Sequence, residues 1–187
     1  MEVTEDARRA WLLPRVDRRC AEAIERVVEF IAEHLAIATA DAVTVRILSP
    51  DGKALVPLSA HHPEPTISAA MVSVMGETVQ PSDSGLWAPV LEERRPRRWQ
   101  MPEGYVPPEA SPQQVSFLER FPIRAVLGVP LLVDERVVGG VSVVRFTVDR
   151  PFTDQDEALV LACATRIAPM LDLRTRLSSL ADADLTT

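Results

Sequence analysis

The fold of this 187-residue chain is decided by the stretch Ile123-Arg-Ala-Val-Leu-Gly-Val-Pro-Leu-Leu-Val-Asp-Glu-Arg-Val-Val-Gly-Gly-Val-Ser-Val-Val-Arg145. Two runs rich in aliphatic residues, 125–133 and 137–146, flank the polar turn 134–136. This arrangement predicts a β-hairpin. Both strands are apolar over much of their length, which is typical of strands in the middle of a sheet covered on both faces.

A second hairpin is predicted earlier in the chain. Val43, Val45 and Ile47 alternate with polar residues, and turn residues at 49–52 precede a further apolar run. Pro57 interrupts that run. Because proline lacks the N–H that a sheet ladder needs, we expect the second strand to lie at an edge or to contain a bulge.

Helical periodicity brackets the two hairpins. Apolar residues recur at three- and four-residue spacing after Pro14, where the first helix is expected to be interrupted or to start afresh. The last helix carries the spacing Val160, Cys163, Ile167, Met170, Arg174 and Leu177, which fits a dimer seam, although packing on its own sheet explains the first half equally well. We expect helices over residues 5–35, 65–77, 85–93, 112–120 and 153–180.

Residues 79–122 form the least regular part of the chain. They hold eight of its sixteen prolines together with five aromatic residues. A disordered linker is poor in aromatic residues, so we expect this segment to fold back as a layer over the body of the protein. Its aromatic residues are Trp87, Trp99, Tyr105, Phe117 and Phe121.

Two further motifs near this layer are candidate ligand contacts. His61 and His62 are adjacent, and neighbouring strand residues point to opposite faces, so they do not share one metal ion without a kink. Arg98 belongs to the arginine-rich run 92–99, which ends in an indole. This run either holds an anionic or aromatic molecule, or is a solvated surface neutralised by its own glutamates.

The composition excludes several functions. A net charge of −7 argues against a nucleic-acid partner, which normally needs a basic face. No apolar run approaches the roughly 20 residues of a membrane span, and the first residues lack the order of a signal peptide, so we expect a cytoplasmic protein without a membrane partner. Cys20 and Cys163 lie in helix-like segments and are interpreted as small buried hydrophobic residues.

Catalytic and cofactor motifs are missing from the sequence. It contains no G-x-G-x-x-G, G-x-x-x-x-G-K, G-x-S-x-G, H-E-x-x-H or C-x-x-C pattern. We therefore predict no enzymatic activity, no cofactor and no metal. An enzyme that works through His61, His62 or Arg98 remains the weaker alternative, because no nucleophile with a recognisable partner is present.

The order of helix, hairpin, helix, irregular segment, hairpin and long helix resembles a GAF domain. The stretch 123–145 resembles the family's V-P-L strand, turn and V-x-G strand. Pro151-Phe-Thr-Asp-Gln-Asp-Glu157 resembles the F-T-x-x-D start of its last helix, and Gly85-Leu-Trp-Ala-Pro-Val90 resembles its G-L-x-x-x-V/A segment. The resemblance covers roughly residues 19–177.

This resemblance implies an α+β, GAF/PAS-like fold. A central antiparallel sheet would carry the terminal helices on one face and a pocket on the other, covered by residues 79–122. We expect an N-terminal extension at 1–14, one domain over 15–177 and a flexible tail at 178–187.

Known subtypes of the family fit poorly. The N-K-x-F-x-x-x-D-E signature of cyclic-nucleotide binders keeps Phe152, Asp156 and Glu157 but lacks its Asn and Lys. The cysteines near the pocket that bilin-binding and methionine-sulfoxide-reducing members use are also missing.

The resemblance implies a non-catalytic sensory or regulatory module in signal transduction. It would bind an unidentified small molecule under residues 79–122 and signal through terminal helices that form a homodimer. The alternative is a degenerate domain that acts only as a protein-interaction or dimerisation scaffold. The expected ligand-binding residues are His61, His62, Trp87, Arg98, Trp99, Tyr105, Phe117 and Phe121.

Overall fold

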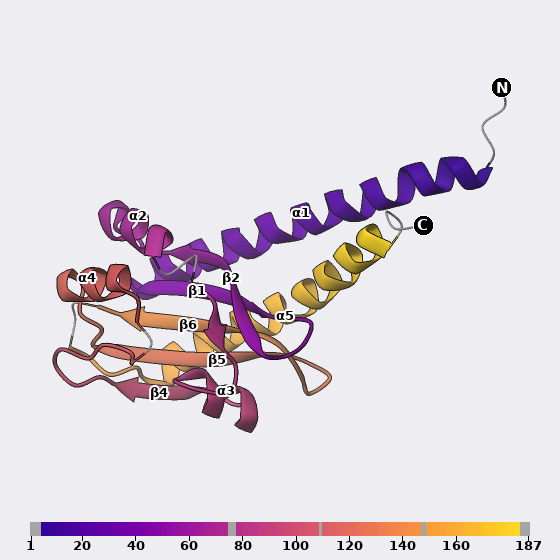
Figure 1. Cartoon of the computed structure of the whole chain (residues 1–187). Helices are drawn as coiled ribbons and strands as arrows, with labels where there is room; N and C mark the ends of the chain where they lie inside the picture. The colour runs from indigo at the N-terminus through magenta and orange to yellow at the C-terminus, as the bar shows by residue number, and fades with distance from the viewer. Residues whose placement is uncertain (1–4, 75–77, 109, 147–148, 184–187) are drawn as a thin grey trace.

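The computed structural model describes residues 5–74, 78–108, 110–146 and 149–183. Within them the chain forms one six-stranded antiparallel sheet with the strand order β3-β2-β1-β6-β5-β4 (Figure 1). The strands are β1 (Ala42–Leu48), β2 (Ala54–His61), β3 (Gln80–Pro81), β4 (Arg97–Gln100), β5 (Ala125–Val133) and β6 (Arg136–Arg145). The helices are α1 (Glu5–Thr39), α2 (Pro65–Val74), α3 (Trp87–Glu93), α4 (Pro112–Arg120) and α5 (Asp154–Ala183). The predicted α+β class is confirmed, as are both hairpins.

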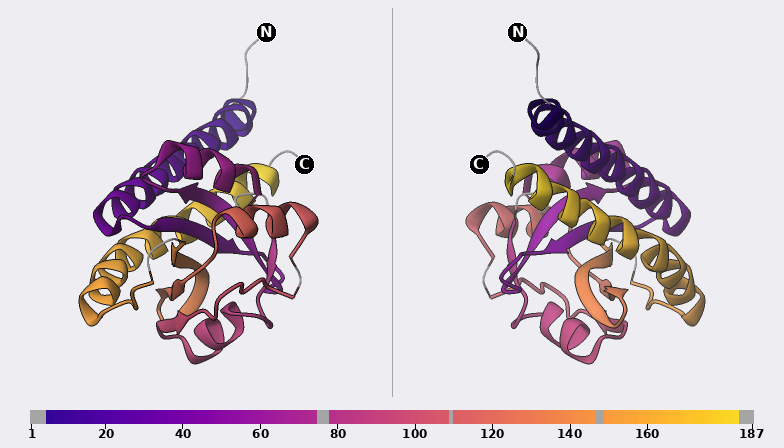
Figure 2. Two further views of the ribbon diagram at one scale, coloured as in Figure 1. Left: turned by 90° about the vertical axis from the view of Figure 1, so that its left-hand side faces the viewer. Right: turned by 90° about the vertical axis from the view of Figure 1, so that its right-hand side faces the viewer.

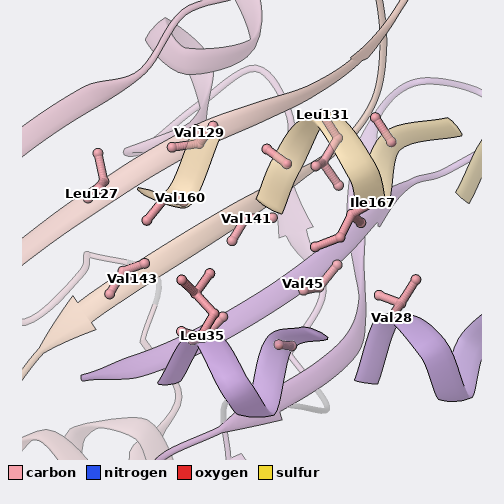
Figure 3. Close-up of a cluster of buried hydrophobic side chains, with 14 of the residues drawn as sticks. Val28, Leu35, Val45, Leu127, Val129, Leu131, Val141, Val143, Val160 and Ile167 are labelled. Carbon is pink, nitrogen blue, oxygen red and sulfur yellow. The ribbon is translucent and has the colours of Figure 1, made fainter. Parts of the chain in front are cut away.

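The terminal helices α1 and α5 cover one face of the sheet. Alternate residues of the central strands, such as Val45 of β1 and Val141 of β6, are fully buried against them. Figure 3 shows these valines facing Val28 of α1 and Ile167 of α5. This cluster is the main hydrophobic core of the protein.

The opposite face of the sheet is covered by the middle of the chain. A second cluster places Ala42, Val126 and Val144 of the sheet against Phe117 of α4 and Met71 of α2. The two views of Figure 2 show the terminal helices and the middle segment as separate layers on either side of the sheet. Residues of the proline-rich segment, such as Phe117, thus pack on this face of the sheet.

A buried ion pair joins the end of β6 to Asp41, the residue directly before β1. Arg145 and Asp41 are 1% and 5% exposed, and the guanidinium donates from Nε to Asp41 Oδ1 at 2.9 Å. The same guanidinium donates to the carbonyl oxygens of Arg150 and Pro151 and lies 4.1 Å from the ring centroid of Phe152. One side chain thus fixes the approach to α5 relative to the central strands.

Several boundaries differ from the sequence expectations. Helix α1 continues through Pro14 instead of breaking there: proline removes one helical hydrogen bond, but long helical segments on both sides remain. Helix α5 continues to Ala183, beyond the expected end near 180 and into the segment expected to be a tail, of which 184–187 lie outside the described residues. The two short strands β3 and β4 were not predicted. Pro57 lies at a register shift of the β1–β2 ladder, as expected for a bulge.

The dimer seam expected on α5 is occupied within the chain. Val160 and Ile167 are fully buried in the core between α5 and the sheet. Further along the helix, Arg174 donates to Glu25 Oε1 of α1 at 2.8 Å. The three-four spacing that indicated a seam is therefore explained by packing on the sheet and on α1.

Candidate ligand cavity

A cavity of about 160 Å³ lies between the sheet and the segment that covers it. Its wall is mostly apolar, with polar side chains at a few points. The described lining residues are Thr44, Arg46, Thr78, Val79, Gln80, Pro81, Ser84, Gly85, Leu86, Trp87, Trp99, Tyr105, Pro107, Pro108, Ala110, Gln114, Leu118, Ile123, Val126, Gly128, Ser142 and Val144.

Strand alternation supplies the floor of the cavity. Thr44 of β1 and Ser142 of β6 are directly paired across the ladder, and their hydroxyl oxygens lie 2.7 Å apart. Successive residues of a strand point to opposite faces of the sheet, so the residues next to Thr44 and Ser142 in each strand point to the face covered by α1 and α5. The floor is therefore one sheet thickness away from α1 and α5.

Glycines let two indole rings approach the sheet closely. A Cβ atom on Gly140 would lie 2.3 Å from a ring carbon of Trp87, and one on Gly128 would lie 3.3 Å from a ring carbon of Trp99. The Trp87 indole N–H donates to Gln80 Oε1, which fixes the direction of that ring. Both rings pack on the floor and still leave the cavity beside them.

Helix α4 and the segment before β3 form the opposite wall. Ser111 and Gln114 make a capping box at the start of α4, in which the Ser111 backbone N–H donates to Gln114 Oε1 at 2.7 Å. The amide nitrogen of Gln114 reaches Thr78 Oγ1 at 3.3 Å. A residue that begins the helix thus also holds the wall opposite the sheet.

Arg46 brings a positive charge to the cavity wall. It lies on the same face of β1 as Thr44 and is only 2% exposed. Its guanidinium donates to the carbonyl oxygen of Thr78. Burial lowers the pKa of Arg46 from its ordinary value to about 10, so the group is still protonated near neutral pH.

Three of the predicted ligand contacts line the cavity, namely Trp87, Trp99 and Tyr105. Phe117 and Phe121 lie behind the wall in the second core cluster, with ring centroids 5.1 Å apart. They support the wall instead of lining it. Their helical periodicity is that of a core face, which explains why composition alone did not separate them from the cavity residues.

The structure places Arg98 away from the cavity. Strand β4 turns Trp99 to the cavity face, so its neighbour Arg98 points to the other face and donates to Asp154 and Glu157 of α5, each at 2.7 Å. The arginine-rich run therefore contains a strand paired with β5 and an ion-pair link to α5. From sequence alone, only a ligand contact or a solvated surface was expected for this run.

The two histidines also lie outside the lining. His61 pairs with Val43 across β1 and β2, and Val43 belongs to the helix-covered core. His62 accepts a hydrogen bond from the backbone N–H of Glu64 at 3.0 Å and lies near Phe146. Within the described part of the chain, no group of three or more His, Cys, Asp or Glu side chains is arranged to hold a metal ion.

The polar lining residues were missed from sequence. Thr44 and Arg46 were interpreted only as the polar half of an alternating strand, and Gln80, Gln114 and Ser142 belong to no motif. A signal was available in part: the alternation predicts that Arg46 shares a face with Thr44, and a covering layer over that face was expected.

Comparison with known proteins identifies the architecture. The family model described as "GAF domain" matches residues 19–171, which is most of the chain. The chain belongs to the GAF domain family. GAF domains are in general regulatory sensor domains. The matched residues include the sheet and the cavity, together with most of the two terminal helices.

Solved GAF domains share this fold at low sequence identity. The GAF domain/HD domain protein from Geobacter sulfurreducens aligns with a TM-score of 0.63 and 19% identity over 81% of this chain and 94% of that one. The GAF domain of a phosphoenolpyruvate-protein phosphotransferase from Coxiella burnetii aligns with a TM-score of 0.61 and 17% identity, over 90% of this chain and 95% of that one. The GAF-B domain of DevS from Mycobacterium smegmatis aligns with a TM-score of 0.57 and 19% identity, over 86% of this chain and 98% of that one. No curated protein matches the sequence.

Among the helices of the described residues, none has the length and apolar character that a membrane span requires.

Proposed function

We propose that this GAF domain is a cytoplasmic, non-catalytic sensory module that binds a small molecule in the cavity between the sheet and residues 78–118. The observation that carries the proposal is the cavity itself. Trp87 and Trp99 are packed onto glycines of the sheet, yet about 160 Å³ remains beside them. A mostly apolar space with a few fixed polar groups has the composition of a ligand site.

The sheet offers a direct route from this cavity to the terminal helices. Thr44 and Ser142 form its floor, while Val45 and Val141 next to them contact the α1 and α5 layer on the other face. A bound molecule that displaces Thr44 and Ser142 would therefore change how α1 and α5 pack on the other face of the sheet. Their relative position is the output that we propose.

Dimerisation is proposed through α1, since Val160 and Ile167 of the seam expected on α5 are buried in the core and Arg174 is bonded to α1. An exposed apolar stripe runs along α1 at alternating spacings of three and four residues, as in the heptad of a coiled coil. Ala21, Val28 and Leu35 occupy the opposite, buried face. The stripe comprises Leu13, Val16, Cys20, Ala23, Val27, Phe30 and Ile37, with His34 between the last two. Cys20 is therefore exposed, contrary to the buried position expected from the sequence. A second copy of the chain, with an identical stripe, is the occupant that we propose.

The alternative function is a dimerisation or protein-interaction scaffold without a ligand. Native mass spectrometry of freshly purified protein separates the two functions. We expect a small bound mass that disappears in Ala110→Phe, because a larger side chain there reduces the cavity that Ala110 lines. Thermal melting would first establish that the variant is folded. A chain without any bound mass, also after incubation with small-molecule mixtures, would favour the scaffold.

A further inference from the structure

We infer that the cavity takes an uncharged, single-ring aromatic molecule carrying one group that both accepts and donates a hydrogen bond, an amide or a hydroxyl, and that this group meets the hydroxyl pair of Thr44 and Ser142. This inference deepens the proposed function and rests on it. Three properties of the lining carry the inference: a hydroxyl hydrogen without an acceptor, flat walls around a small volume, and a charge that the protein already uses.

The hydroxyl pair on the floor has one hydrogen more than it uses. Thr44 Oγ1 and Ser142 Oγ lie 2.7 Å apart, so one hydroxyl donates to the other. The hydrogen of the accepting hydroxyl has no acceptor among the described residues. The two residues are only 4% and 8% exposed, and both line the cavity. A buried donor without a partner is unfavourable, so a ligand atom that accepts this hydrogen would be bound favourably.

The amide oxygens of the lining are already in use. Gln80 Oε1 accepts the indole N–H of Trp87, and Gln114 Oε1 accepts the backbone N–H of Ser111. The hydroxyl pair, by contrast, offers a donor and unused lone pairs side by side. A primary amide or a hydroxyl of a ligand has the complementary acceptor and donor, whereas a ketone or an ether would meet only the donor.

The volume of the cavity matches a single six-membered ring. A cavity of roughly 150 Å³ in another protein holds benzene, and the present one has about 160 Å³. The rings of Trp87, Trp99 and Tyr105 line it, together with Pro107 and Pro108. Aromatic and proline rings present flat surfaces, which favour stacking with another flat molecule over contact with a branched aliphatic one.

The charge of the lining is already used by the protein. Arg46 is the one formally charged residue among the described residues that line the cavity. Its guanidinium donates to the carbonyl oxygen of Thr78, and Arg46 has a further interaction besides. An anionic ligand would therefore compete with contacts that the guanidinium already makes. The described lining contains no carboxylate that would pair with a cation. Because a buried charge without a partner is strongly unfavourable, the lining favours a neutral molecule.

Isothermal titration of the full chain at neutral pH with benzamide and benzoate tests the inference. The two probes share a ring and an overall shape and differ in charge. We expect one benzamide site per chain and about tenfold weaker binding of benzoate, whose carboxylate would be buried without a free cation. Cyclohexanecarboxamide, which keeps the amide and loses the flat ring, should bind more weakly than benzamide. Benzoate binding as tightly as benzamide, or no binding of benzamide, would overturn the inference.

A double variant assigns the polar contact to the hydroxyl pair. Thr44→Val with Ser142→Ala removes both hydroxyl groups, and replacing both partners of a hydrogen bond by apolar groups of similar shape is nearly neutral for stability. Benzamide should bind about tenfold more weakly to this variant, because its amide loses its partners on the floor. Toluene, which has no polar group, should bind at least as tightly as it does to the wild type.

Ser59→Ala is the matched control. Ser59 pairs with Val45 across β1 and β2, so its hydroxyl lies on the face that the terminal helices cover. Removing this hydroxyl should leave the affinities for benzamide and toluene unchanged. An unchanged affinity for benzamide in the folded double variant would contradict the inference. If the double variant does not fold, the comparison of benzamide with benzoate on the wild-type chain still decides.

The outcomes also separate this inference from the proposed function. Binding of toluene or benzoate in preference to benzamide, with no effect of the double variant on benzamide, refutes the neutral polar ligand and leaves a small-molecule cavity in place. Absence of any bound mass in the native spectrum, together with no binding of any probe, refutes both.

Discussion

The indole of Trp87 occupies the space that a side chain on residue 140 would fill. A Cβ atom on Gly140 would lie 2.3 Å and 2.6 Å from two carbons of that ring. The Trp87 indole N–H is held by Gln80, so the ring is fixed at its far edge as well. The glycine is therefore required for α3 to pack on the sheet and for the cavity to keep its shape.

Gly140→Ala should destabilise the protein by about 1–3 kcal/mol, because a methyl group forces a rigid ring and its helix away from the strand. Gly128→Ala is the matched control: its nearest contacts, Val90 and Trp99, lie at 3.0 Å and 3.3 Å and need to move less. Denaturant midpoints of the two variants give the comparison. Equal stability of Gly140→Ala and the wild type would show that Trp87 has room to move.

The sheet was predictable because its hairpins are local. In each hairpin the two paired strands are adjacent in the sequence and are joined by a short turn. The alternation in 43–47 and the apolar runs in 125–146 therefore predict the pairing from local sequence alone. Strand β4 was not predictable in this way: it has four residues, three of them polar, and pairs with β5 only across a long connection that includes α4. Its pairing puts Trp99 toward the cavity and Arg98 toward α5.

The aromatic part of the site was predictable and the polar part was not. Trp87, Trp99 and Tyr105 stand out in a proline-rich segment and line the cavity. Arg46 is a polar residue in an alternating strand, a pattern typical of a solvated face. It is buried because residues far along the chain cover it, and sequence periodicity does not show which polar face will be covered.

Removing one partner of the buried Arg145–Asp41 pair should strongly destabilise the folded protein. Asp41→Asn leaves an arginine with 1% exposure opposite a neutral amide, and we expect a loss of about 3–5 kcal/mol. Asp154→Asn, which breaks an ion pair whose Asp154 side chain is 96% exposed, should cost at most about 1 kcal/mol. Urea unfolding of both variants gives the two values. Comparable losses would contradict the structural role assigned to Arg145.

The exposed stripe on α1 should control the oligomeric state. Val27→Glu combined with Phe30→Glu puts charges on two residues that are 45% and 58% exposed, so the monomer fold should be kept and the dimer lost. Arg26→Glu with Glu33→Arg, which also changes exposed residues of α1 but leaves the apolar stripe intact, is the control. Sedimentation velocity across a concentration series measures the result. A wild-type chain that stays monomeric at every concentration would refute the proposed dimer.

His62 should make stability depend on pH. Burial lowers the pKa of His62 below its ordinary value of 6.5, although Glu64 and Asp41 act in the opposite direction. The folded state thus favours the neutral ring, and the unfolded state binds more protons just below pH 6.5. This contribution to stability is present above that pH and declines as the pH falls toward the folded-state pKa.

Melting temperatures at about pH 7 and about pH 5.5 measure this contribution. The decrease on acidification should be smaller in His62→Gln than in the wild type. His34→Gln, which removes an exposed histidine of α1, should leave the wild-type decrease in place. An equal decrease in His62→Gln and the wild type would contradict the assignment.

The central claim is that the cavity binds a small molecule, and tryptophan emission tests it most directly. The chain has three tryptophans: Trp87 and Trp99 line the cavity, and Trp11 is 61% exposed on α1. In Trp11→Phe, all remaining tryptophan emission comes from the cavity. Titration with benzoate, benzamide and toluene should give a saturable change with at least one probe, and Ala110→Phe in the same background should abolish it. Emission that stays constant with all three probes in the folded Trp11→Phe chain would contradict the claim.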